Sequence, residues 1–314
     1  MSNSAAGPEL GAIDLSAFAA GNGGIPYVWI YVSKAPGPHL MICALIHGNE
    51  ICGAHAVADL LEDEIRPVRG RLTLAFAKIA AYETFDAANP APSRFLDEDL
   101  NRVWAADVLD SDRRSRELAR ARALRSMIDD VDHFLDLHSM QTQCPLLALA
   151  GLTAKGRELA RNVGAPAHVV VDVGHAGGTR LRDYASFADP TNPRSALLIE
   201  SGQHWRASSR DVAMDICQRF LTAFGASDGT APIAGPQHLI EVTEAITVAS
   251  GEFVFTTAYQ GLEVVPSAGT VIAINGGTEV RTPYDDCVLI MPSLRLRPGQ
   301  TAVRLGRYIT EVAA

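Results

Sequence analysis

The chain has 314 residues, of which 47% are hydrophobic and 20% charged, so it can bury the core of one large domain or two. Its 36 acidic and 27 basic residues give a formal net charge of -9, which argues against a nucleic-acid partner bound through phosphate contacts. No apolar stretch is long enough to span a bilayer, no secretory signal is recognisable, and the five dispersed cysteines fit a reducing compartment, so we expect a cytoplasmic protein without a membrane partner.

The first two thirds of the chain alternate between short β-prone runs and amphipathic segments. Apolar, β-branched runs bounded by Pro and Gly predict strands, and apolar residues at helical spacing predict helices. The predicted strands cover residues 26–32, 39–46, 71–79, 133–138, 145–150, 167–171 and 195–199, and the predicted helices cover residues 50–65, 113–130, 153–163 and 208–224. This alternation predicts an α/β fold with a mixed, mostly parallel sheet flanked by helices.

The character of the sequence changes after residue 228. The β-prone runs that follow are short, are separated by Gly and Pro, and cover residues 239–247, 253–257, 262–265, 271–274, 287–291 and 302–308. Strands at this spacing predict a small all-β domain. We therefore divide the chain into a first domain at residues 1–228 and a β-rich C-terminal domain at residues 229–314.

His47 and Glu50 lie three positions apart where a predicted strand gives way to a predicted helix. Such a placement can aim an imidazole nitrogen and a carboxylate oxygen at one point, and these are two of the three protein ligands of a catalytic zinc ion. The pattern is weak alone, because a polar loop with a helix-capping carboxylate has the same sequence. A third ligand is expected at the end of another strand.

The polar passage at residues 82–104 contains Arg94, Asn101 and Arg102. Irregular segments of this length are uncommon in compact domains and are often functional. Asn101 and Arg102 can present an amide and a planar guanidinium to one carboxylate, and Arg94 can polarise a carbonyl or hold a developing oxyanion. The acidic residues 97–99 support an equally good alternative, in which arginine–carboxylate pairs connect a solvated loop.

His138 is the candidate for the third ligand. It ends a predicted strand and shares one face with Asp136, because side chains alternate along a strand. Asp136 either orients the imidazole of His138 or is a solvated strand end. Glu200 closes another apolar strand, where open α/β sheets place their ligands, and burial there would raise its pKa toward a value useful for accepting a proton. Its alternative role is to cap the following helix.

Two further segments keep two interpretations each. Residues 174–182, which include Arg180 and Arg182, form either a loop that recognises the substrate or a flexible connection. His204 either lines the pocket or begins the next helix, and the second interpretation is preferred.

Four motifs, in this order, resemble the succinylglutamate desuccinylase/aspartoacylase family, a branch of the zinc carboxypeptidase-like superfamily. They are residues 47–50, residues 99–102 with Arg94 ahead of them, residues 136–139, and the strand that Glu200 closes. The resemblance covers most of the chain, because the family also carries a β-rich C-terminal domain after its catalytic one. It therefore implies a zinc-dependent catalytic domain at residues 1–228.

The resemblance implies that His47, Glu50 and His138 hold Zn²⁺ and that Glu200 is the general base and then the general acid. The implied activity is that of a deacylase, an amidohydrolase that cleaves the amide of a small N-acyl amino acid or related N-acylated amine with metal-activated water. Two alternatives remain, a zinc carboxypeptidase that acts on peptides and a catalytically inactive zinc module that binds carboxylates.

The family also implies roles around the substrate. Asn101 and Arg102 would bind its carboxylate, Arg94 would polarise the scissile carbonyl, and Tyr284, where the local match is loose, would reach in from the C-terminal domain. The run at residues 200–205 departs from the one typical of aspartoacylase itself, which speaks against N-acetylaspartate as the substrate. Homo-oligomers are common in this family, and nothing in the sequence fixes a symmetry.

Overall fold

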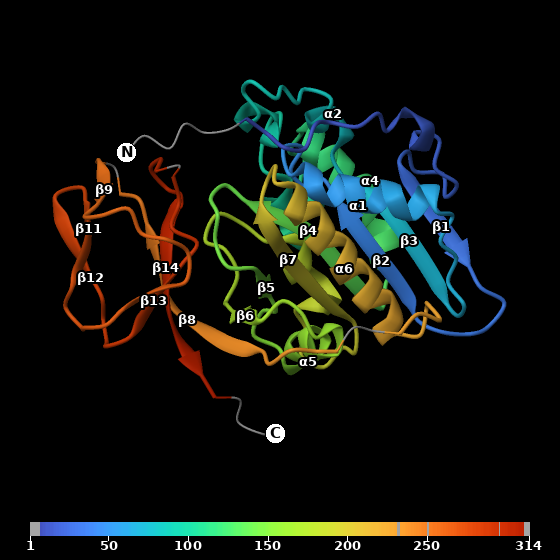
Figure 1. The fold of residues 1–314 in the computed structure, drawn as a ribbon. Helices are drawn as coiled ribbons and strands as arrows, with labels where there is room; N and C mark the ends of the chain where they lie inside the picture. The colour runs from blue at the N-terminus through green and yellow to red at the C-terminus, as the bar shows by residue number, and fades with distance from the viewer. Residues whose placement is uncertain (1–6, 231–232, 250, 295, 311–314) are drawn as a thin grey trace.

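The helices and strands follow the predicted order through the first two thirds of the chain. The computed structural model of the protein describes residues 7–230, 233–249, 251–294 and 296–310 (Figure 1). Within these ranges, the α-helices are α1 (Ile51–Glu62), α2 (Ile79–Tyr82), α3 (Ala106–Leu109), α4 (Arg116–Ile128), α5 (Ala154–Val163) and α6 (Ala207–Ala223). Short 3-10 helices are η1 (Ser16–Phe18), η2 (Ala91–Arg94), η3 (Leu100–Arg102), η4 (Leu181–Asp183) and η5 (Ala185–Phe187).

The strands of the first part are β1 (Val28–Val32), β2 (His39–Ala44), β3 (Arg71–Phe76), β4 (His133–Met140), β5 (Leu147–Leu149), β6 (His168–Val171) and β7 (Ser195–Gln203). Those of the C-terminal part are β8 (His238–Thr247), β9 (Phe253–Phe255), β10 (Glu263–Val265), β11 (Val271–Asn275), β12 (Thr278–Arg281), β13 (Cys287–Ile290) and β14 (Thr301–Ile309). All match predicted runs except β12, which the sequence did not indicate.

One large mixed sheet organises the molecule. Its eleven described strands lie in the order β1-β3-β2-β4-β7-β5-β6-β8-β14-β13-β10 (Figure 1). The strands β3, β2, β4 and β7 are parallel neighbours, whereas β1 and β5 each pair antiparallel with this block. The predicted α/β fold with a mixed sheet is thus confirmed.

Both faces of the sheet are covered, which explains why β2 is apolar without alternation. Leu40 and Ile42 face the cluster formed with α1, α5 and α6, and Met41 and Cys43 face the cluster formed with α4. Every residue of β2 is consequently buried. Among the described residues, none of the helices combines the length and the apolar character that a membrane crossing requires.

The C-terminal part continues the large sheet. β8 pairs parallel with β6, so that β8, β14, β13 and β10 extend it, while β12, β11 and β9 form a small antiparallel sheet of their own. In Figure 1 these orange and red strands lie beside the β5–β6 side of the sheet. The predicted β-rich character is confirmed, and a domain boundary at residue 228 stays a prediction.

Candidate metal centre

The turn between β2 and α1 carries His47 and Glu50. Gly48 lets this turn pack directly on η2, because a Cβ at this position would clash with the backbone oxygen of Ser93. The N–H of Gly48 also donates a hydrogen bond of 3.1 Å to the carbonyl oxygen of Arg94. The absence of a side chain at Gly48 therefore brings Arg94 next to His47.

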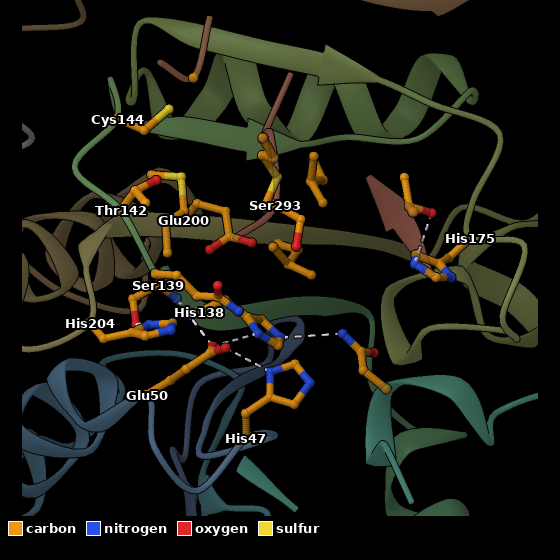
Figure 2. Close-up of a pocket in the computed structure, with 18 of the residues that line it drawn as sticks. His47, Glu50, His138, Ser139, Thr142, Cys144, His175, Glu200, His204 and Ser293 are labelled. Carbon is orange, nitrogen blue, oxygen red and sulfur yellow. Dashed lines mark hydrogen bonds and ion pairs between the residues drawn. The ribbon is translucent and has the colours of Figure 1, made fainter. Parts of the chain in front are cut away.

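His138 reaches the same point from β4. One ligand atom from each of His47, Glu50 and His138 lies within 4.8 Å of the others, and all three side chains are buried (Figure 2). The two oxygens of Glu50 lie 2.8 Å from Nδ1 of His47 and 2.8 Å from Nδ1 of His138, and Oε2 also accepts a hydrogen bond from the backbone N–H of Ser139. The sequence thus correctly grouped these three residues.

Two further carboxylates lie beside the second nitrogen of each imidazole. Nε2 of His47 lies 2.9 Å from Asp99 Oδ1, and Nε2 of His138 lies 3.0 Å from Asp136 Oδ2. Each imidazole therefore lies between two carboxylates, with Glu50 at Nδ1 and Asp99 or Asp136 at Nε2, and Nε2 of His47 also lies 2.9 Å from Nη2 of Arg94. Of the two roles considered for Asp136, its burial and this contact favour orienting the imidazole.

The donor set fits a divalent metal ion. Two neutral imidazoles and one carboxylate are a common protein ligand set of catalytic zinc. Burial opposes ionisation of Glu50, but the positive charge of the protonated imidazoles of His47 and His138 outweighs it and holds the pKa of this carboxyl well below its usual range, and a bound cation would act in the same direction. A cation is the group that lone pairs from two imidazoles and a carboxylate can share without repulsion.

Glu200 faces this cluster from the neighbouring strand. It is paired in register with His138 across the parallel strands β4 and β7, so both side chains project from the same face of the sheet. Burial, and next the charge of Glu50, raise the pKa of Glu200 to about 8. Its Oε2 is buried without a hydrogen-bond partner among the described residues. Glu200 lies within β7 rather than at its end and does not cap α6.

Three side chains of the 94–102 loop reach the same cavity. Arg94 Nη1 donates a hydrogen bond of 2.8 Å to Glu50 Oε1, and the amide of Asn101 lies 3.4 Å from His138 Nε2. Arg102 bonds the backbone oxygen of Asn101 at 2.6 Å, and burial first lowers its pKa to about 10. Asn101 also accepts a hydrogen bond from the backbone N–H of Leu181.

The acidic residues of this loop do what the alternative interpretation expected. Asp97 pairs with Arg116 at 2.6 Å and Glu98 with Arg113 at 2.5 Å, both on the outside of the molecule. Asp99 instead turns inward to His47. The loop therefore has an outer side held by ion pairs and an inner side that lines the cavity.

The cavity above the cluster has a volume of about 180 Å³ and opens into an outer vestibule of about 620 Å³. Arg94, Arg102 and His175 line both of these spaces. Residues 174–182 contribute His175 and Arg180 to its wall, which favours the first interpretation of this loop. His204 also lines the cavity, with its ring 2.9 Å from the hydroxyl of Ser139, and the expectation that it only begins α6 is wrong.

The C-terminal part contributes wall residues that the sequence did not reveal. Arg304 of β14 and the segment 291–293 line the cavity, whereas Tyr284 does not. The hydroxyl of Tyr284 is instead 2.6 Å from Thr243. The one available signal was an arginine between two apolar residues of a predicted strand, Val303 and Leu305, which are both buried.

A buried His–Glu–His group and a second buried carboxylate thus lie together at the central strands of the sheet. A metal-binding group beside a carboxylate that can accept a proton is typical of hydrolases. The sequence model of the succinylglutamate desuccinylase/aspartoacylase catalytic domain matches residues 36–221, and the chain belongs to this family of deacylases. A comparison with curated proteins gives no match.

Solved structures with the same fold cover nearly the whole chain. A succinylglutamate desuccinylase from Vibrio parahaemolyticus has 18% identity and a TM-score of 0.71 over 91% of this chain and 87% of its own. The enzyme of that name from Vibrio cholerae has 18% identity and a TM-score of 0.67 over 90% and 86%. A product-bound ectoine utilization protein from Ruegeria pomeroyi has 15% identity and a TM-score of 0.64 over 89% and 87%. At these identities the likeness concerns the fold.

Proposed function

We propose that the protein is a zinc-dependent amidohydrolase of the zinc carboxypeptidase-like type, which removes the acyl group from a small N-acyl amino acid or a related N-acylated amine. The observation that carries this proposal is the convergence of His47, Glu50 and His138 within 4.8 Å, with Glu200 projecting from the same face of the sheet. Membership in a deacylase family supports the reaction type.

The metal would be held by Nδ1 of His47, Nδ1 of His138 and the carboxylate of Glu50. When bound, zinc supplies a Lewis acid that lowers the pKa of water and stabilises negative charge on a carbonyl oxygen. With a cation at both Nδ1 atoms, each Nε2 would carry the proton and donate it to Asp99 or Asp136, which would hold the imidazoles in the ligating tautomer.

Glu200 is the proposed proton carrier. It takes a proton from the attacking water as the C–O bond forms, and it returns this proton to the leaving nitrogen as the C–N bond breaks. A pKa raised by burial suits both steps, because the carboxyl group can hold and release a proton near neutral pH. Arg94 lies next to Glu50, where it can stabilise the oxyanion of the tetrahedral intermediate.

The carboxylate of the substrate is assigned to Asn101 and Arg102. Both line the cavity, and a guanidinium binds a carboxylate through two parallel hydrogen bonds. The limited volume of the inner cavity and its wall from the C-terminal part favour a small substrate over a peptide chain. This arrangement supports the deacylase over the carboxypeptidase.

Metal analysis combined with a substrate screen tests the proposal. We expect the zinc-loaded protein to hydrolyse at least one member of a panel of acetyl, formyl and succinyl derivatives of acidic, basic and neutral amino acids. His138→Ala should lose zinc. His133→Gln, on the same strand but stacked on Phe224 outside the site, should retain it.

Glu200→Gln separates binding of the metal from chemistry. We expect this variant to retain zinc and to lose turnover by about a thousandfold or more, as general acid–base catalysis and a required proton transfer are both removed. Normal turnover in Glu200→Gln would exclude it from the mechanism. A zinc-loaded wild type that is inert toward the whole panel would instead support a module that only binds carboxylates.

A further inference from the structure

The peptide bond between Asn49 and Glu50 lies in the middle of the metal-binding turn, residues 47–50. The carboxylate of Glu50 faces both His47 and His138, with an oxygen 2.8 Å from each Nδ1 (Figure 2). A peptide group is planar and rigid, so its orientation decides the direction in which the next residue projects its side chain. The groups that hold this peptide therefore also aim the carboxylate of Glu50.

Both polar groups of this peptide are hydrogen-bonded. The N–H of Glu50 donates a bond of 3.1 Å to the carbonyl oxygen of His47, which closes the turn. The carbonyl oxygen of Asn49 accepts a bond of 3.0 Å from Nε1 of Trp205. The side chain of Asn49 does not hold the turn, because it is fully buried and neither of its polar atoms has a hydrogen-bond partner among the described residues. The indole of Trp205 thus supplies a donor that a buried carbonyl group requires.

Trp205 connects the metal-binding turn with the strand that carries Glu200. It lies two residues beyond the end of β7, and its backbone N–H donates a hydrogen bond of 3.0 Å to Oε1 of Gln203, the last residue of that strand. Its ring packs against the hydrophobic cluster that α1, α5 and α6 form with the sheet. One side chain therefore keeps the end of β7 and the turn at residues 47–50 in a fixed relation.

The N-terminal segment in turn holds Trp205. The carbonyl oxygen of Trp205 accepts hydrogen bonds from the backbone N–H groups of Glu9 and Leu10, both of 2.9 Å. The carboxylate of Glu9 accepts a bond of 3.0 Å from the N–H of Ala207, the first residue of α6, and pairs with Arg206. Leu10 is buried in the cluster against which the ring of Trp205 packs. The N-terminal segment and β7 together therefore fix the position of this tryptophan.

We propose that Trp205 is a positioning residue of the metal centre, which holds the Asn49–Glu50 peptide so that the carboxylate of Glu50 completes the ligand set. The inference rests on the proposed function, because it concerns the same metal site. Trp205 does not line the cavity, so it acts through Glu50 rather than on the substrate. Loss of its hydrogen bond should change the geometry of the metal ligands and leave Asn101 and Arg102 in place.

Metal affinity is the first test. Trp205→Phe removes the indole N–H and keeps an aromatic ring in the cluster. We expect its zinc affinity, titrated against a competing chelator, to fall about tenfold or more, as it does when a residue that orients a metal ligand is replaced. Glu9→Ala is a second variant, on the surface, which loosens the support of Trp205 without changing its ring. It should weaken zinc binding in the same direction but by less.

Trp29 offers a matched control. It is also a partly buried tryptophan that packs against the same cluster, and its Nε1 donates a hydrogen bond of 3.1 Å to the carbonyl oxygen of Phe18, which is not part of the turn. Trp29→Phe loses the same kind of bond and should show a similar shift in urea unfolding, but it should keep the zinc affinity of the wild type. An equal loss of zinc affinity in Trp29→Phe and Trp205→Phe would mean that both act only through stability, and the proposal would fail.

Cobalt in place of zinc reports the arrangement of the ligands, because the visible absorption of Co²⁺ depends on its coordination geometry. The spectrum of cobalt-loaded Trp205→Phe should differ from that of the wild type, and the spectrum of Trp29→Phe should match it. At saturating zinc, the kcat of Trp205→Phe should fall about tenfold. Its KM should stay unchanged, since Asn101 and Arg102 are not affected.

The outcomes separate this inference from the proposed function. If the wild type binds zinc and hydrolyses a substrate while Trp205→Phe keeps the same zinc affinity and cobalt spectrum, the positioning role is overturned and the hydrolase stands. If the wild type binds zinc but hydrolyses nothing, weaker binding and an altered spectrum in Trp205→Phe still support the role. Should Trp205→Phe fail to fold, the zinc affinity of Glu9→Ala decides, and an unchanged value overturns the role. A wild type that binds no metal overturns both.

Discussion

Glu117 of α4 holds the cavity-lining loop from the side opposite the substrate. It is fully buried, and its two carboxylate oxygens accept hydrogen bonds from three consecutive backbone N–H groups, those of Leu96 at 2.9 Å, Asp97 at 3.1 Å and Glu98 at 3.3 Å. The ammonium of Lys78 lies 3.3 Å from Oε1. These contacts fix residues 96–98, which lie between Arg94 on one side and Asn101 and Arg102 on the other.

The Glu117→Gln substitution removes the charge but keeps the size of the side chain. One oxygen becomes an NH₂ group that faces N–H donors, and Lys78 stays buried without its counter-ion. Hydrogen bonds to a charged group each contribute about 1.5–3 kcal/mol, and breaking a buried ion pair costs about 3–5 kcal/mol. Because part of the loop can relax toward solvent, we expect a loss of about 3 kcal/mol in the free energy of unfolding.

Urea unfolding and steady-state kinetics measure the effect of Glu117→Gln. We expect a lower unfolding midpoint, and a drop in kcat/KM of about tenfold or more because the loop no longer holds Arg94 in position. Asp97→Asn on the same loop is the control, since the Asp97 ion pair with Arg116 is exposed and its loss should leave stability nearly unchanged. A Glu117→Gln protein as stable and as active as the wild type would refute the reasoning.

Three further predictions concern the site. Arg94→Lys should retain zinc but lower kcat at least about tenfold, because an ammonium cannot reproduce the planar guanidinium. Asp136→Asn should weaken zinc affinity by about 10–100-fold in a titration against a competing chelator, since Asp136 orients the imidazole of His138. The pKa of His175 is about 3 in the folded chain, so below pH 6.5 the unfolded chain binds a proton that the folded chain does not. When the pH falls from 7 to 5, the free energy of unfolding of the wild type should therefore decrease by up to about 2 kcal/mol more than that of His175→Gln.

Each of these predictions has a clear opposing result. Full kcat in Arg94→Lys would remove the guanidinium from the oxyanion site, and an unchanged zinc affinity in Asp136→Asn would leave Asp136 without an orienting role. Parallel stability curves for His175→Gln and the wild type would mean that His175 titrates normally in the folded chain.

The convergence of His47, Glu50 and His138 was predictable because its signals are local. The spacing of His47 and Glu50 at a strand–helix junction, and the alternation that puts Asp136 and His138 on one face, follow from the geometry of single elements. The buried strands and the amphipathic helices follow from periodicity for the same reason. The order of the four motifs, which resembles that of the family, then indicated that these separate residues belong to one site.

The walls of the cavity were not predictable, because they depend on which distant strands become neighbours. The sequence does not say that β8 pairs with β6, and this pairing decides that β14 presents Arg304 to the cavity. Tyr284 shows the same limit from the other side. Its position in the sequence suited a residue that reaches the substrate, yet the fold of the C-terminal strands leaves it against Thr243.

The pairing of β6 with β8 also has a consequence for shortened versions of the chain. If the protein ended after α6, residues 168–171 would lose the partner that now satisfies their outward N–H and C=O groups. This short run is β-branched and apolar, and a bare edge of that kind templates the addition of a strand from another molecule. We therefore expect a chain without its C-terminal part to aggregate. By pairing with β6, β8 prevents this strand from pairing with another molecule.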